Sequence, residues 1–327
     1  MSKTAALPAI DVLLGPNDRR ELLERDVREG LAAAPKRLAT KWHYDEEGSR
    51  LFSAITELPE YYLTRRERAI LEERAGEIAA ASDADTLVEL GAGTSTKTRL
   101  LLDAFRARDS LARIELLDVD EATLRASAAK LADEYPGVEV RGVVGDIERH
   151  LGALPQEGRR MVAFLGSSIG NLDPSERAVF LAGLRGTMSP GETFLLGADL
   201  VKDPARLVAA YDDAAGVTAR FSLNILNVVN RELDANFDLA RFRHVPRWDA
   251  AREVIDVRLR SLEDQRVRIE ALDLEVDFAE GEELHTEISS KFRRTGLEQE
   301  LAAAGFEPAE WWTDRDADFA VSLSRAV

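Results

Sequence analysis

A glycine-containing stretch, residues 86–98, combines the residue types and spacing most suited to holding a ligand. An apolar run with β-branched members leads to Gly91 and Gly93, and the residues that follow are typical of a helix start. A strand, a tight glycine turn and a helix N-terminus in this order open nucleotide-type α/β folds. Glycine lets a ligand approach the backbone closely, and the first helical turn offers unpaired N–H groups.

Three kinds of ligand suit such a turn, and the neighbouring residues help to separate them. Dinucleotide and phosphate-binding loops both require glycine at position 96, where this chain has Thr96. A β-branched residue there would strain or block a phosphate cradle, although Lys97-Thr98 fits the phosphate-loop pattern. S-adenosylmethionine (SAM) has no phosphate, and the acidic residues Glu89 and Asp118 suit it. The stretch therefore favours SAM, and NAD, a nucleoside triphosphate and a purely structural turn remain alternatives.

Composition narrows the class of protein. The chain has 327 residues, 45% of them hydrophobic, a net charge of −17 and no cysteine. The charge disfavours nucleic-acid and anionic-membrane surfaces, and no run is long enough to span a bilayer. The four histidines lack metal-site spacing, so we expect no metal, and the missing cysteines and signal pattern predict a cytoplasmic protein. The acidic surface favours a monomer.

Strands and helices alternate regularly after residue 86, which predicts a parallel, doubly wound sheet in an α/β fold. The expected strands cover 86–90, 114–118, 138–144, 161–165 and 193–196, and the expected helices end near 106, 135 and 188. Ligands of such sheets bind beyond the carboxyl ends of the strands. Asp118, Asp146 and the loop 166–171 lie there, so one carboxylate is expected to accept ribose hydroxyls and the other an adenine amino group.

The segment 166–170 matches the G-x-S-x-G pattern of a hydrolase nucleophile elbow. That elbow requires a helix to begin at the serine, whereas Asp173 and Pro174 mark a later helix start. We therefore regard the hydrolase as a minor alternative. Asn171 offers an amide that can bind the amino and carboxylate groups of a substrate.

The remaining segments predict a second, α+β substrate-binding domain. Helical patterns cover 203–211 and 221–233, strand-like patterns cover 253–261, 267–278 and 284–292, and a helix and two strands close the chain. An N-terminal leader precedes a helix near 19–33 and an aromatic segment, which is either a structural cap or the wall of a small-molecule pocket. The predicted divisions are 1–64 as part of the substrate domain, 65–200 as the SAM-binding domain, 201–290 as the specificity insertion and 291–327 as the return to the sheet.

Taken together, these motifs resemble those of the L-histidine Nα-methyltransferases of ergothioneine biosynthesis, a family with a class I methyltransferase (Rossmann-like) fold. The resemblance extends over nearly the whole chain. It rests on segments 44–49, 58–62, 88–95, 164–171, 199–203, 211–218 and 286–289.

The resemblance implies a set of site residues. SAM, which becomes S-adenosylhomocysteine, would be held by Gly91, Lys97, Asp118, Asp146 and Ile147. L-histidine would be held by Tyr61, Gly166, Asn171, Tyr211, Glu287, Ile288 and Ser289. Tyr44, Tyr61 and Asn171 would serve catalysis, with Tyr44 close to the reacting amine. Glu287 and Ser289, at positions i and i+2 of a strand, can bracket an imidazole.

The chain departs from the family pattern at two positions. Ile147 replaces a usual aromatic residue beside the adenine, and Val257 stands where many relatives have methionine. The smaller valine could loosen discrimination against larger side chains. The implied activity is three successive methylations of the α-amine of histidine to hercynine, and the alternatives are methylation of another amino acid such as tryptophan, or a nucleotide-binding protein without this chemistry.

Overall fold

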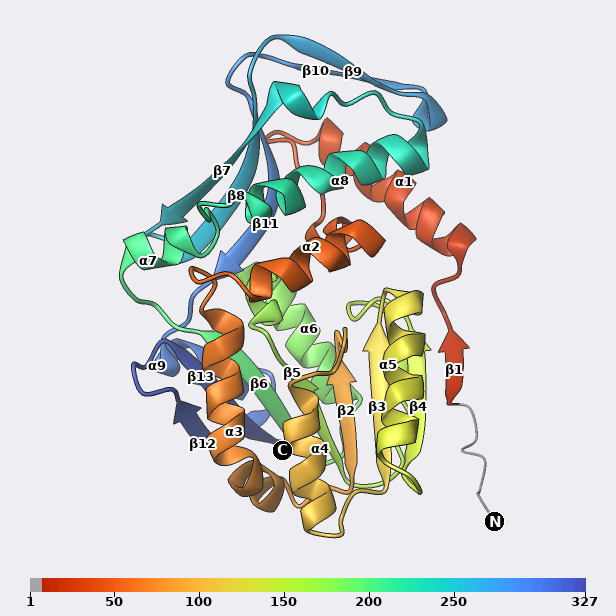
Figure 1. Ribbon diagram of the computed structural model, residues 1–327, viewed down its shortest axis with the longest axis vertical. Helices are drawn as coiled ribbons and strands as arrows, with labels where there is room; N and C mark the ends of the chain where they lie inside the picture. The colour runs from red at the N-terminus through yellow and green to blue at the C-terminus, as the bar shows by residue number, and fades with distance from the viewer. Residues whose placement is uncertain (1–7) are drawn as a thin grey trace. The chain divides into compact units, whose positions relative to one another are not determined.

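The computed structural model describes residues 8–327 as two compact units, and the first seven residues of the predicted leader lie outside the described residues (Figure 1). The sheet unit contains 8–14, 63–200 and 292–327, and the hairpin unit contains 15–62 and 201–291. Among residues 8–327 every helix is too short or too polar to cross a membrane.

An eight-stranded sheet forms the centre of the sheet unit, and it confirms the predicted doubly wound α/β class. Its strand order is β1-β4-β3-β2-β5-β6-β13-β12. The strands from β1 to β6 are mutually parallel, whereas β13 runs antiparallel to β6 and β12. The strand bounds are β1 Ala9–Val12, β2 Thr86–Leu90, β3 Arg113–Asp118, β4 Glu139–Val144, β5 Arg160–Phe164, β6 Thr193–Asp199, β12 Phe306–Thr313 and β13 Phe319–Ala326.

Helices cover both faces of this sheet. Helices α3 (Leu63–Ser82), α4 (Thr98–Ala107) and α5 (Glu121–Glu134) lie on the near face in Figure 1. Helices α6 (Pro174–Gly186) and α9 (Arg294–Ala303) pack into one hydrophobic core with strands of the sheet. The predicted start of α6 is confirmed, because the Asp173 side chain accepts from the N–H groups of Ser175 (2.8 Å) and Glu176 (2.9 Å).

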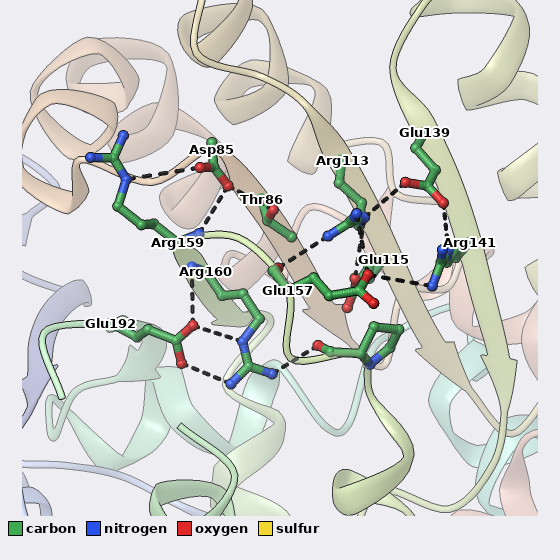
Figure 2. A network of polar contacts seen from close by, with 11 residues as sticks. Asp85, Thr86, Arg113, Glu115, Glu139, Arg141, Glu157, Arg159, Arg160 and Glu192 are labelled. Atoms are coloured by element: carbon green, nitrogen blue, oxygen red, sulfur yellow. Dashed lines mark hydrogen bonds and ion pairs between the residues drawn. The ribbon is translucent and has the colours of Figure 1, made fainter. Parts of the chain in front are cut away.

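Charged residues tie the strands together at the ends where β2, β3 and β5 begin (Figure 2). Arg160 is 1% exposed and binds both carboxylate oxygens of Glu192, at 2.9 and 2.7 Å. Arg113 donates to Glu139 (3.0 Å) on the neighbouring strand. Glu115 is buried beside these arginines without a hydrogen-bond partner for its carboxylate oxygens in the described chain. Burial raises the pKa of Glu115 to about 7.

The hairpin unit combines helices with two small antiparallel sheets. Its strands are β7 Phe242–Asp249, β8 Val254–Ser261, β9 Gln265–Ile269, β10 Leu274–Phe278 and β11 Glu283–Ser290. One sheet has the order β11-β8-β7, and β9 pairs with β10 in the other. The helices are α1 Pro16–Ala32, α2 Glu46–Thr56, α7 Pro204–Ala209 and α8 Val217–Leu233, and α8 is buried along much of its length.

Three features of the fold differ from the sequence expectations. The pattern at 267–278 was expected to be one strand, but it belongs to the hairpin of β9 and β10, whose connection contains Asp273 at φ +46°. Strand β7, which contains Pro246, was not foreseen, and it lies at the edge of its sheet where proline is tolerated. Residues 9–12, expected in a leader, form β1 beside β4.

Candidate functional site

The predicted site residues are divided between the two units. Gly91, Lys97, Asp118, Asp146, Ile147, Gly166 and Asn171 belong to the sheet unit, and Tyr44, Tyr61, Tyr211, Glu287, Ile288 and Ser289 belong to the hairpin unit. In the sheet unit, Asp118 is the last residue of β3, the others except Lys97 follow the carboxyl ends of β2, β4 or β5, and Lys97 directly precedes α4.

The glycine turn after β2 is held by Asp118, the last residue of β3. Gly91 and Gly93 have φ values of +65° and +49°, which glycine adopts without strain. The N–H of Gly93 donates to Asp118 Oδ2 at 2.8 Å, and the N–H of Asp120 donates to Asp118 Oδ1 at 2.9 Å. Burial raises the pKa of Asp118 above its usual range. The carboxylate therefore fixes the turn while keeping lone pairs for ligand hydroxyls.

Glu89 lies beneath the same turn. It is 5% exposed and accepts from Ser95 Oγ (2.7 Å) and from Thr98 Oγ1. Burial raises the pKa of Glu89 to about 7. The sequence predicted that Glu89 suits a SAM ligand. In the structure its buried carboxylate hydrogen-bonds to the loop between β2 and α4 and stabilises it.

Lys97 contacts a carboxylate that the sequence analysis missed. Its ammonium binds the carboxylate of Glu67, a fully buried residue of α3. The other oxygen of Glu67 accepts the N–H of Gly166 at 2.7 Å. A Cβ at Gly197 would lie 2.0 Å from the Glu67 carboxylate, so β6 leaves room for this side chain only because residue 197 is glycine. Glu67 therefore connects α3, the loop before α4 and the loop after β5.

Asp146 and Ile147 follow β4. Asp146 is 2% exposed; its N–H donates to His150 Nδ1 (2.9 Å) and its carboxylate accepts the N–H of Glu148 (2.8 Å). Ile147 is partly buried against the main hydrophobic core. The two residues offer a polar acceptor and an apolar surface side by side, and whether they contact adenine stays a prediction.

The G-x-S-x-G segment does not form a nucleophile elbow. After β5, Gly166 (φ +80°) and Ser167 (φ +60°) turn the chain, and a short 3-10 helix follows over Ser168–Asn171. The Ser168 hydroxyl donates to the carbonyl of Leu165 (3.1 Å), and the Ser167 hydroxyl accepts the N–H of Asp199 (2.9 Å). Both serines hold the loop that ends at Asn171, so the arrangement disfavours a hydrolase.

In the hairpin unit, aromatic rings bring three predicted tyrosines together. Tyr44 packs edge-on against Phe52 and Phe221, with ring centroids 5.7 and 5.5 Å apart. Phe52 packs against Tyr61 (6.1 Å), and Tyr61 against Tyr211 (6.5 Å). Edge-to-face packing fixes ring orientation while leaving each phenol a polar tip.

The residues that flank Tyr44 explain the motif around it. Asp45 is the N-cap of α2, and its carboxylate accepts from the backbone N–H of Gly48 (2.8 Å) and from the side chains of Asn224 (2.8 Å) and Arg231 (2.7 Å). A Cβ at Gly48 would lie 1.7 Å from the carbonyl oxygen of His43, so only glycine fits there. This part of the motif positions Tyr44.

Strand β11 carries the predicted imidazole contacts. Glu287 pairs in register with Val257 of β8, and Ser289 pairs with Ile255, so the four residues lie on one face of the sheet. The Tyr211 hydroxyl donates to Ser289 Oγ at 2.7 Å. Lys291, which the sequence analysis missed, is 3% exposed and binds both Tyr211 and Ser289.

One acidic cluster elsewhere could be mistaken for a metal site. Asp314, Asp316 and Asp318 offer carboxylate oxygens within 4.8 Å of one another. The Arg66 guanidinium pairs with all three, at 3.4 Å from Asp314, 2.5 Å from Asp316 and 3.2 Å from Asp318. One arginine therefore pairs with every carboxylate of this cluster and offsets part of its negative charge.

The sheet unit fits SAM better than a phosphate ligand. Two carboxylates at the strand ends, Asp118 and Asp146, suit hydroxyl and amino groups and would repel a pyrophosphate. Thr96 stands where a phosphate loop needs glycine, and the Lys97 ammonium is paired with Glu67. These observations also disfavour the nucleoside triphosphatase.

Comparison with known proteins identifies the family. Residues 23–326 match the model of the family described as histidine-specific methyltransferase, SAM-dependent. The chain is 57% identical to a histidine N-alpha-methyltransferase of Mycolicibacterium smegmatis and 55% identical to one of Mycobacterium tuberculosis, in each case over 95% of this chain and 97% of the relative. It is 36% identical to ergothioneine biosynthesis protein 1 of Neurospora crassa over 60% of this chain and 23% of that protein. The chain belongs to the histidine-specific, SAM-dependent methyltransferases.

Proposed function

We propose that the protein transfers three methyl groups from SAM to the α-amine of L-histidine and forms hercynine, the first step of ergothioneine biosynthesis. The likeness to two histidine N-alpha-methyltransferases over 95% of the chain carries this proposal. The carboxylate and hydroxyl that share one face of β11 support it, because an imidazole offers a complementary N–H and lone pair.

In this proposal the sheet unit binds SAM through Gly91, Lys97, Asp118, Asp146 and Ile147. When bound, SAM would supply a sulfonium methyl group for in-line attack by an unprotonated amine, with S-adenosylhomocysteine as the leaving group. The Gly91–Gly93 turn presents backbone to the ligand, and Asp118 accepts from its hydroxyl groups.

The hairpin unit, in the same proposal, orients L-histidine. Tyr211 and Tyr61 bind the amino acid, together with Ile288 of this unit and with Gly166 and Asn171 of the sheet unit. Glu287 and Ser289 bind the ring. Tyr44 or Tyr61 accepts a hydrogen bond from the amine and keeps its lone pair directed at the methyl group. Each of the first two rounds releases an amine proton, and the third gives a quaternary ammonium. Alignment and exclusion of water supply the rate enhancement.

We also propose that the protein is a cytoplasmic monomer, that it needs no metal, and that it binds neither nucleic acid nor membrane. Its net charge of −17 supports the last two.

Incubation of the protein with SAM and each of the twenty amino acids, followed by mass spectrometry, tests the proposed substrate. We expect a gain of three methyl groups on histidine alone. Methylation of tryptophan or another amino acid in place of histidine would contradict the substrate assignment, and Val257, buried directly opposite Glu287, would then be the first residue to exchange.

A further inference from the structure

Three alternate residues share one face of their sheet, two at the end of β11 and one directly after it. Glu287 and Ser289 pair with Val257 and Ile255 of β8. The ladder continues at Lys291, whose N–H donates to the carbonyl of Glu253 at 2.8 Å. Because side chains alternate along an extended strand, residues 287, 289 and 291 project to the same side.

Lys291 and Ser289 form a closed ring of hydrogen bonds with Tyr211. The Lys291 ammonium donates to the Tyr211 hydroxyl at 2.9 Å and to Ser289 Oγ at 2.8 Å. The Tyr211 hydroxyl donates to Ser289 Oγ at 2.7 Å. Lys291 also lies 4.8 Å from the centroid of the Tyr211 ring. Only 3% of Lys291 is exposed, so burying its ammonium costs desolvation free energy. An apolar side chain would fill the same space without that cost.

The proton count of this ring fixes the direction of the Ser289 hydroxyl. An ammonium can only donate, so it occupies one acceptor position on each oxygen. A phenol is far more acidic than a serine hydroxyl, and a neighbouring cation strengthens it further as a donor, so Tyr211 donates to Ser289. Ser289 Oγ then accepts twice, and its own hydrogen must point away from the ring.

We propose that Lys291 is a specificity-determining positioning residue that makes Ser289 a fixed hydrogen-bond donor. Glu287, two residues earlier on the same face, is an acceptor when ionised. The pair therefore recognises a ring with one N–H and one nitrogen lone pair, which is the neutral tautomer of imidazole. An indole lacks the lone pair and a thiophene lacks both groups. This inference rests on the proposed function and deepens it.

Ring analogues of histidine test the donor role by binding, independently of turnover. Affinities are measured calorimetrically in the presence of S-adenosylhomocysteine for L-histidine, β-(2-thienyl)-L-alanine and the 4- and 5-thiazolyl-L-alanines. Each thiazole keeps an acceptor nitrogen, at one of the two ring positions, and has no N–H. The wild type should bind histidine and one of the two thiazolylalanines more tightly than thienylalanine.

The informative variant is Lys291→Met, which allows the Ser289 hydroxyl to rotate. We expect it to weaken histidine and that same thiazolylalanine about tenfold relative to thienylalanine, the usual effect of losing one directed hydrogen bond. Lys36→Met is the matched control, because Lys36, like Lys291, lies beside an aromatic ring, 5.0 Å from the centroid of Phe278, and its ammonium has a polar partner, the carboxylate of Glu282. It should leave the ratios unchanged.

Equal weakening of all analogues by Lys291→Met would assign the lysine a structural role and overturn the inference. If that variant does not fold, Ser289→Ala must abolish the preference for nitrogen-containing rings, and an unchanged preference would also overturn it. Failure of the wild type to bind or methylate histidine would instead contradict the proposed function.

Discussion

Replacement of Glu67 by glutamine tests how the SAM side of the site is assembled. The buried carboxylate of Glu67 binds Lys97 and the N–H of Gly166. Breaking a buried ion pair costs about 3–5 kcal/mol. The cost should be smaller here, because the Lys97 side chain is 22% exposed and glutamine keeps an acceptor for the N–H of Gly166. We therefore expect the free energy of unfolding to fall by about 2 kcal/mol. That corresponds to a fall in Tm of about 4–8 °C for a unit of this size.

The same substitution should weaken SAM binding. Without its partner, Lys97 must be ordered when the ligand binds, at a cost of about 1 kcal/mol, which corresponds to roughly a five- to tenfold rise in Kd. Titration calorimetry measures Kd, and thermal unfolding followed by circular dichroism measures Tm.

Glu192→Gln provides the matched control, because it breaks another buried ion pair, that of Glu192 with Arg160. This pair lies where β5 and β6 begin, at the opposite ends of the strands from the candidate site. It should lower Tm without changing the Kd for SAM. If Glu67→Gln weakens SAM no more than Glu192→Gln does, Glu67 does not organise the donor site and the reasoning fails.

Three further predictions follow from single residues. Burial raises the pKa of Glu115 to about 7, so between pH 4.5 and 7 the folded state keeps a proton that the unfolded state releases, and stability falls as pH rises through this range. Glu115→Gln should therefore raise Tm at pH 8 and have little effect at pH 4. An equal change in Tm at both pH values would contradict this reasoning. Gly197→Ala should lower Tm by displacing Glu67, whereas Gly186→Ala, whose Cβ meets nothing within 4 Å, should not; equal Tm values would refute the steric argument. Tyr44→Phe should change the ratio of partly to fully methylated product in mass spectra, and an unchanged ratio would remove Tyr44 from the amine site.

The sequence predicted the local structure in those parts of the candidate site that a short segment determines. Gly91 and Gly93 stand where positive φ is needed, and Asp118 and Asp146 lie at the carboxyl ends of parallel strands, which meet at one edge of the sheet. The resemblance to the methyltransferase family implied the pair Glu287 and Ser289, and the two-residue period of a strand predicted that both side chains lie on one face. In these cases a short segment contains the whole signal.

Other residues could be identified only from tertiary contacts. Glu67 is one of several glutamates in α3, and nothing in the helical pattern shows that it is the one buried beneath Gly166. Lys291 continues the alternation of β11, but its ring with Tyr211 joins residues 80 positions apart. The hairpin of β9 and β10 was missed because its turn uses Asp273 at positive φ instead of glycine, which left an unbroken strand-like pattern.

The position of the methyl groups on the product tests whether the protein methylates histidine at its α-nitrogen. The protein is incubated with methyl-¹³C SAM and ¹⁵N-labelled L-histidine, and the product is examined by ¹H–¹³C–¹⁵N correlation NMR. We expect three equivalent methyl groups bonded to the α-nitrogen and none on the ring. Methyl groups on an imidazole nitrogen, or no methylation of histidine while another amino acid is modified, would contradict it.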